Sequence, residues 1–345
     1  MAPNHDILSE DAHVQYLDVD GNVRHSKPIA RHEHKVYKGS AWVQGLTGEW
    51  QKAGWTRIYL KRDGGSPLIE GAFSLFGDHH HIQERSTYFQ ARRQIDVEIE
   101  ESREDGMIVY RDSDMVPEGR SELKRDDSSS AVCGSDDLAF NSDPEHSVFG
   151  TRSVDANTDW GSMLAKPEKR QSGNIGTGNL RATIGDTTGC PTELRVAMIG
   201  IATDCTYTAE FSSVDAVQAN LVSMVNSASD VYERTFNITL GLRNLTISDR
   251  DCPTTAPESA RWNIPCSEGN IEDRLDLFSR WRGGLDGGND GNAYWTLMST
   301  CSSGRSVGLA WLGQVCVSSL TGYGGQSVSG ANVVVRTPGE WQVFA

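Results

Sequence analysis

Residues 194–242 read LRVAMIGIATDCTYTAEFSSVDAVQANLVSMVNSASDVYERTFNITLGL, and this stretch decides the fold of the second half of the chain. It begins with a short apolar run over 194–201, which is typical of a buried strand. Ser213 is a candidate helix cap, and apolar residues follow it at helical spacing. These residues are Val214, Val217, Leu221, Met224, Val225, Ala228 and Val231. Alternation over 236–242 predicts a second strand, so the order indicates a right-handed βαβ unit.

The rest of the second half continues this pattern. We expect a second helix over 271–281, because its apolar residues recur at helical spacing. Two more strands are predicted over 294–298 and 306–312. Helices that alternate with strands indicate an α/β domain with a mixed or mostly parallel sheet over 186–345.

Residues 1–125 show a strand-like pattern instead. Three runs in them alternate between apolar and polar side chains. The runs are 55–60, 69–76 and 95–100. Asp105-Gly106 is a turn signal, and it predicts a hairpin that joins 97–99 to 107–110. We therefore predict a mainly β domain over 1–125.

The 345 residues amount to about two domains, and the composition changes near residue 170. Every Lys lies at or before Lys169, and every His lies at or before His146. Residues 126–185 are mostly Ser, Asp, Asn, Gly and Pro, which cannot bury enough apolar surface to form a core. We interpret them as an exposed polar linker. The dibasic pair Lys169-Arg170 within it is interpreted as a processing site, with a solvated charge pair as the alternative.

The charge of the chain argues against one class of partner. The 47 acidic against 32 basic side chains give a formal net charge of −15, so we expect no nucleic-acid partner. No apolar stretch approaches the roughly 18 residues of a membrane span, and no signal peptide is expected at the start of the chain. Sequons at Asn237 and Asn244 nevertheless favour the secretory pathway, with a secreted or cell-surface protein as the product.

Cysteine content also favours an oxidising compartment. Six cysteines fall in the second half, and they are Cys190, Cys205, Cys252, Cys266, Cys301 and Cys316. They form three pairs of chain neighbours about 15 residues apart, and we predict that these neighbours are bonded, although six cysteines allow about fifteen connectivities. Reduced thiols in a cytosolic protein are the alternative.

Three further motifs are interpreted as structural. Residues 304–308 (GRSVG) match the nucleophile turn of serine hydrolases, but no His follows residue 146 to act as the base. The histidines of 79–81 and 32–34 lack the spacing of a zinc trio, so we expect a solvated or packed cluster. The Gly-rich stretch 283–291 lacks the Glu that closes a calcium-binding EF-hand, and we expect a loop.

Several segments, taken in order, carry a family resemblance that covers nearly the whole chain. They are LIEGAFSLFG (68–77), HHI (80–82), VCG (132–134), LRVAM (194–198), VGLAWLG (307–313) with Cys316, and 333–345. In this order they resemble the propeptide and the start of the catalytic domain of ADAM-type (reprolysin/adamalysin-like) zinc metalloproteases, most closely the fungal branch. Within them, Val132-Cys133-Gly134 resembles the family's cysteine switch.

The resemblance implies a mostly β propeptide followed by an incomplete α/β metzincin-like subdomain. In the family the zinc signature H-E-x-x-H-x-x-G-x-x-H follows directly after the segment that 333–345 resembles. Residues 171–345 contain no His, so they cannot supply the three imidazole ligands of such a zinc site. We therefore expect a latent zinc endopeptidase in the full-length protein, and no bound zinc and no catalytic residues in the chain as given. A non-catalytic inhibitory or peptide-binding protein is the alternative.

The resemblance also assigns roles to particular residues. The Cys133 thiolate would bind zinc in the latent form and exclude the catalytic water. A kexin- or furin-like protease would cut after Arg170. The strand Val307, Gly308, Leu309, Ala310 and Trp311 would pair with an extended protein or peptide substrate through main-chain hydrogen bonds. An ordinary sheet strand is the alternative for these five residues.

Overall fold

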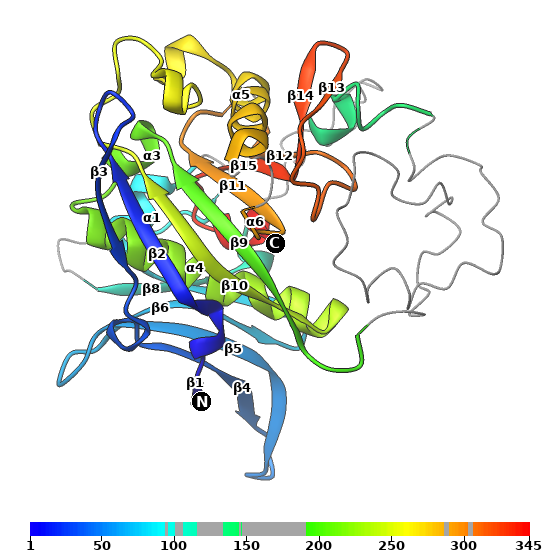
Figure 1. Cartoon of the computed structure of the whole chain (residues 1–345). Coiled ribbons are helices and arrows are strands. Elements are labelled where there is room, and N and C mark those ends of the chain that lie inside the picture. Colours follow the sequence, from blue (N-terminus) through cyan, green and yellow to red (C-terminus); the bar gives the residue numbers. More distant parts are fainter. Residues whose placement is uncertain are drawn as a thin grey trace, which may run out of the picture.

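The structure is a computed structural model. It describes residues 1–93, 96–100, 106–115, 134–144, 146, 191–285, 290–302 and 306–345. Its centre is the long helix α4 (Val214–Phe236), which lies between a seven-stranded and a six-stranded sheet (Figure 1). The expected cap is confirmed, because the Ser213 side chain accepts a hydrogen bond from the Ala216 amide.

The seven-stranded sheet has the order β12-β15-β11-β9-β10-β2-β3. Its four central strands are β9 (Arg195–Thr203), β10 (Ile238–Ile247), β11 (Tyr294–Ser299) and β15 (Ala331–Val335). They pair in parallel, and β9, α4 and β10 form the predicted βαβ unit. The short strand β12 (Gly308–Ala310) closes one edge in antiparallel pairing with β15. This α/β arrangement confirms the class expected for the second half.

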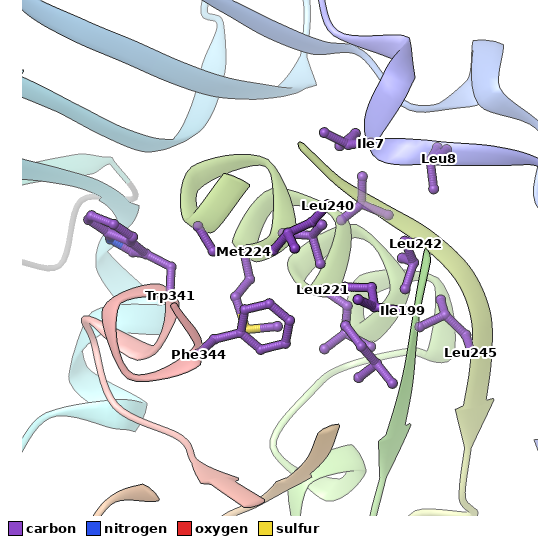
Figure 2. Close-up of a cluster of buried hydrophobic side chains, with 14 of the residues drawn as sticks. Ile7, Leu8, Ile199, Leu221, Met224, Leu240, Leu242, Leu245, Trp341 and Phe344 are labelled. Atoms are coloured by element: carbon purple, nitrogen blue, oxygen red, sulfur yellow. The ribbon is translucent and has the colours of Figure 1, made fainter. Parts of the chain in front are cut away.

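The other edge of this sheet comes from the first residues of the chain. Strand β2 (Leu8–Leu17) pairs in parallel with β10, and β3 (Val23–Pro28) pairs antiparallel with β2. Ile7 and Leu8 are buried in the same core as Leu221, Leu240 and Leu242 (Figure 2). One hydrophobic core therefore contains residues from both halves of the chain.

The six-stranded sheet is antiparallel and has the order β1-β4-β5-β6-β7-β8. Its strands are β1 (Ala2–Pro3), β4 (Val36–Gln44), β5 (Trp50–Arg62), β6 (Leu68–Leu75), β7 (Asp78–Glu84) and β8 (Met107–Arg111). The tight turn between β6 and β7 places Phe76 and Gly77 at positive φ, which suits a two-residue hairpin loop. The sheet-rich character predicted for this half is confirmed.

One predicted hairpin in this half is wrong. Strand β8 pairs with β7, and residues 97–100 form no strand. Val97 and Ile99 instead pack against a small cluster that contains Tyr88 and Tyr110, and the Tyr88 hydroxyl donates to the Val97 carbonyl. The alternating apolar residues Val97 and Ile99 therefore cover a cluster and do not belong to a strand of the sheet.

Four α-helices and one hairpin complete the described α-helices and strands. They are α1 (Arg85–Ala91), α3 (Cys205–Ala209), α5 (Ile271–Gly284), α6 (Glu340–Phe344) and the hairpin β13 (Thr321–Tyr323) with β14 (Gln326–Val328). Helix α5 begins with a capping box between Asn270 and Asp273. Figure 2 shows Phe344 of α6 beside Met224 of α4. Among the described residues, no helix is both long and apolar enough to cross a membrane.

The disulfides differ from the predicted neighbour pairing. Cys205 is bonded to Cys252 and Cys266 to Cys301, whereas Cys316 is exposed and forms no disulfide within the described residues. Cys205 and Cys252 follow β9 and β10, which are neighbouring parallel strands, so both residues leave the sheet at the same edge. Proximity in the sheet, rather than spacing along the chain, brings them together. Cys190 lies outside the described residues.

This connectivity can be checked directly. Protease digestion of the unreduced full chain should yield linked peptides that carry Cys205 with Cys252 and Cys266 with Cys301, identified by mass spectrometry. Both bonds should disappear on reduction. Recovery of a Cys252–Cys266 peptide would contradict the structure and restore the neighbour pairing.

Candidate functional site

The strand β12 lies at one edge of the seven-stranded sheet. The Val335 amide donates to the Val307 carbonyl at 2.8 Å, and Leu309 is paired with Val333, so this side of the strand is occupied by β15. The main-chain groups of residues 308 and 310 point to the opposite side, because successive residues of a strand alternate in direction. The strand predicted over 307–312 is present, with Gly308–Ala310 as its paired part.

The side chains of this strand anchor it from behind. Leu309 and Trp311 are buried, and the Trp311 indole donates to Ser279 Oγ of α5 at 2.7 Å. Gly308 lies against α6, where a Cβ would come within 2.8 Å of Val343 Cγ1. Only Ala310 is exposed among the predicted residues 307–311. The side chains of Leu309 and Trp311 therefore fix the strand to the core, and its outer side presents main-chain groups.

Helix α6 begins with a buried carboxyl group. Glu340 accepts hydrogen bonds from the Tyr207 hydroxyl at 3.1 Å and from Asn220 Nδ2 at 2.6 Å. Burial raises the pKa of Glu340, and the charge of Arg336 with these two hydrogen bonds opposes the rise only in part. The carboxyl group thus ties α6 to α3 and α4.

His79 and His81 contact the same helix. Trp341 Nε1 donates to His81 Nδ1 at 3.0 Å, and His81 Nε2 lies 2.7 Å from Asp112 Oδ1. Burial alone would raise the pKa of Asp112, but hydrogen bonds from His81, Gln342 and His79 hold it below its ordinary value. The predicted packed cluster is confirmed for His81, and its role is to join α6 to the six-stranded sheet.

The residues described do not fit a catalytic metal. No three His, Cys, Asp or Glu side chains converge on one point within the described ranges. In the His79, His81 and Asp112 group, both nitrogens of His81 already have hydrogen-bond partners, Trp341 and Asp112. A zinc ion needs free lone pairs from several such groups, so we assign no chemical step to a metal at this cluster.

Part of the polar linker lies against the edge strand. Leu138, Asn141 and His146 are buried, although the linker was expected to be exposed. His146 Nε2 lies 3.1 Å from the Leu312 carbonyl, and Asn141 contacts the same stretch of main chain. The expectation of an exposed linker is therefore wrong for Leu138, Asn141 and His146. Nothing in their polar composition indicated a docked segment.

Four predicted site residues lie outside the described residues, namely Cys133, Lys169, Arg170 and Cys190. The two sequon residues are described. Asn237 ends α4 in a left-handed conformation, and its Nδ2 donates to the Pro191 carbonyl at 2.9 Å. Asn244 lies in β10, with its Nδ2 3.2 Å from His13 Nε2. Glycosylation of either residue stays a prediction.

Comparison with known proteins bears on both halves. Residues 192–345 match the family model Reprolysin_5, described as metallo-peptidase family M12. The chain is 52% identical to a protein of Aspergillus fumigatus named "Disintegrin and metalloproteinase domain-containing protein B", and 40% identical to the protein of the same name from Arthroderma otae. Each alignment covers 100% of this chain and 45% of the relative, so the chain spans a little under half the length of these curated relatives.

A solved structure, metalloproteinase-II from Bacteroides fragilis, is a distant likeness. It has a TM-score of 0.26 and 11% identity, over 88% of this chain and 77% of that chain. A likeness of this size carries no argument. The family match and the two fungal relatives confirm the resemblance found in the sequence. The chain therefore belongs to the ADAM-type, reprolysin-like family of metalloproteases, peptidase family M12, in its fungal branch.

Proposed function

We propose that the whole protein is a latent zinc endopeptidase that cleaves proteins, with residues 1–125 as its propeptide and 186–345 as part of its peptidase domain. The observation that carries this proposal is the edge strand β12 beside α6, within the residues that match the peptidase family. An extended substrate would pair with the outer main-chain groups of Gly308 and Ala310. Buried Leu309 and Trp311 would hold that edge rigid.

Zinc is the metal that the family implies, and its ligands would be residues other than those described. When bound, zinc would lower the pKa of its water to about 7 and polarise the scissile carbonyl. The described residues would contribute substrate alignment, through β12, and the packing of α6. Tyr207 and Asn220 enclose the Glu340 carboxyl group in either protonation state. Its role would therefore be to position the start of α6.

The linker, residues 126–185, would keep the protease latent and would be cut to release its activity. Cys133 would bind the zinc of the unprocessed protein, and a kexin- or furin-like protease would cut after Arg170 to begin release. The two disulfides and the family of secreted or cell-surface proteases support a route through the secretory pathway. Glycosylation at Asn237 and Asn244 belongs to the same proposal.

Expression of the whole protein in a secreting fungal host tests this function. We expect a processed form that begins at Gln171 and cleaves quenched fluorescent peptides, with activity lost when a zinc chelator is added. The variant Lys169→Ala/Arg170→Ala should remain unprocessed and should be at least about 100-fold less active, because the zinc would stay blocked. Lys166→Ala is the matched control and should be processed normally. Processed protein without chelator-sensitive cleavage would refute the proposal.

A further inference from the structure

A hydrogen bond between two buried rings attaches helix α6 to the six-stranded sheet. Trp341 Nε1 of α6 donates to His81 Nδ1 of β7 at 3.0 Å. His81 is 1% exposed and Trp341 is 5% exposed, so the bond is closed to solvent. Figure 2 shows that the Trp341 ring leaves α6 in a different direction from Phe344, which lies beside α4. The two rings of α6 therefore contact different layers of the molecule.

The geometry of this bond fixes the protonation state of His81. An indole N–H group is a donor and never an acceptor, so His81 Nδ1 has to accept and carries no proton. His81 Nε2 lies 2.7 Å from Asp112 Oδ1, where it donates to the carboxylate. The bond to Trp341 thus requires a neutral imidazole with its proton on Nε2.

A second proton on His81 would remove the bond to Trp341. Both nitrogens of an imidazolium are donors, so rotation of the ring does not restore an acceptor for the indole. Two N–H groups would then face each other across the 3.0 Å that now separates Nε1 from Nδ1. The proton would bring no new hydrogen bond with Asp112, because Nε2 already donates to that carboxylate. Two buried donors without acceptors would favour separation of the rings.

The groups around the ring act in both directions on its charge. The Asp112 carboxylate and the Tyr110 ring, stacked on His81 with centroids 4.7 Å apart, favour the charged form. His79 opposes it, because His79 Nδ1 shares the same carboxylate at 3.0 Å, and one negative charge would then face two cations. Other charged groups on neighbouring elements are engaged elsewhere: Glu340 with Tyr207 and Asn220, Arg111 with Asp114, Asp78 with Ser113, and Arg234 with Asp230. Whichever influence is larger, the protonated ring has no acceptor for Trp341.

We propose that His81 and Trp341 form an acid-sensitive joint, which holds α6 on the six-stranded sheet at neutral pH and opens when His81 takes up a second proton. Histidine side chains gain charge between about pH 7.5 and 5.5. Asp112 stays ionised over that range, because hydrogen bonds hold its pKa below the ordinary 3.8. The inference concerns the folded chain and does not depend on the proposed activity.

Two other hydrogen bonds join α6 and the residue before its cap to the same sheet and its adjoining turn. Gln342 Nε2 donates to Asp112 Oδ2 at 2.7 Å, and the Gln83 side chain donates to the Pro338 carbonyl. Neither bond needs a neutral histidine. Opening of the joint should therefore loosen α6 while the rest of the chain stays folded.

Hydrogen exchange of the α6 amides in the full chain measures the joint without any activity assay. The Gln342 amide donates to the Gly339 carbonyl and the Ala345 amide to the Trp341 carbonyl, so both report on the helix. After correction for the intrinsic effect of pH on exchange, we expect both to exchange at least about tenfold faster at pH 5.5 than at pH 7.5. The Val335 amide, in the seven-stranded sheet, should show no such change. Equal corrected rates for α6 at the two pH values would overturn the inference.

Trp341→Phe is the decisive variant, because it removes the indole N–H group and keeps an aromatic ring. Protonation of His81 then breaks no hydrogen bond, so the acid-to-neutral ratio of corrected rates should fall to about one. His81→Gln cannot take up the proton and should give the same ratio. His80→Gln is the matched control and should keep the original ratio, because His80 contacts the Asp78 carbonyl of its own strand and stacks on Phe73 of β6. Full acid sensitivity in Trp341→Phe or in His81→Gln would contradict the joint.

Discussion

Replacing Arg57 by Met should lower the free energy of unfolding by about 3 kcal/mol, because the change leaves two carboxylates short of a partner at a buried interface. Arg57 Nη2 lies 3.3 Å from Asp230 Oδ1 and 2.9 Å from Glu233 Oε2. Arg57 belongs to β5 and the carboxylates to α4, so the pair joins the six-stranded sheet to the central helix. Arg234 still contacts Asp230, and Lys38 still contacts Glu233. The expected loss therefore lies at the lower limit of the roughly 3 to 5 kcal/mol that breaking a buried ion pair costs.

Acid should reduce the difference between the variant and the original chain. Burial opposes the charge on Glu233, but the hydrogen bond and charge of Arg57 and the charge of Lys38 outweigh it and lower its pKa from the ordinary 4.5. A depressed carboxyl pKa contributes stability that is complete above the ordinary value and is lost as pH falls through the lowered one. The contribution of Arg57 should therefore be full at pH 7 and should fade below about 4.5.

Urea unfolding of the full chain at pH 7 and at acidic pH measures this effect. Lys35→Met is the matched control, because Lys35 forms an exposed pair with Asp63 at 3.4 Å, and its loss should cost no more than about 1 kcal/mol. Hydrogen exchange on α4 should show where the variant loosens. If Arg57→Met and Lys35→Met were equally stable, the buried pair would not hold the sheet to the helix.

The sequence predicts the elements of this fold better than it predicts their partners. The βαβ unit over 194–242 was predictable, because the cap at Ser213 and the apolar spacing are local signals. The addition of β2 to β10 was not, since pairing of strands more than 200 residues apart leaves no mark in either segment. The same limit explains the bond between Cys205 and Cys252, which follows the pairing of β9 with β10 rather than spacing along the chain. The hairpin over 97–110 failed because β7 contains the histidine run and was not recognised as a strand.

The candidate site likewise contains one part that the sequence predicted and one part that it did not. Strand β12 was predicted from the resemblance of residues 307–313 to a known edge strand, and the structure places it at an edge. The docked segment with Asn141 was missed, because a side-chain amide that bonds to main-chain groups has no signature in composition. Its partners at Ala310 and Leu312 offer only backbone groups, which are identical in every sequence.

Replacing Arg274 by Met should have the largest effect on stability, about 4 kcal/mol. Arg274 and Asp204 are both fully buried, and Arg274 Nη1 lies 2.8 Å from Asp204 Oδ2. The same guanidinium donates to the carbonyls of Trp262 and Ile264. The pair therefore fixes α5 and the loop before it to the residue that follows β9. Removal of Arg274 would leave a carboxylate without a charge partner in the core, together with two unsatisfied carbonyls.

A double variant separates the charge from the packing. Asp204→Asn keeps a side chain that can cap α3, where Asp204 Oδ1 now accepts from the Tyr207 amide at 2.9 Å. Arg274→Met combined with Asp204→Asn should therefore recover much of the stability lost by Arg274→Met alone, as measured by urea unfolding in a double-mutant cycle. Arg280→Met is the matched control on the same helix, because Arg280 is 48% exposed in its pair with Asp276 and should cost no more than about 1 kcal/mol.

The pH dependence of Arg274→Met should arise from a carboxyl group whose pKa is raised, whereas that of Arg57→Met arises from one whose pKa is lowered. Burial raises the pKa of Asp204 above its ordinary 3.8, and the charge of Arg274 only partly opposes this. The folded state thus holds the Asp204 proton more tightly than the unfolded state, and without Arg274 it would hold that proton more tightly still. A proton cancels the buried charge, so the penalty of Arg274→Met should shrink as pH falls towards the raised pKa. A penalty that stays constant from pH 7 into the acid range would show that packing, and not the uncompensated carboxylate, accounts for the loss.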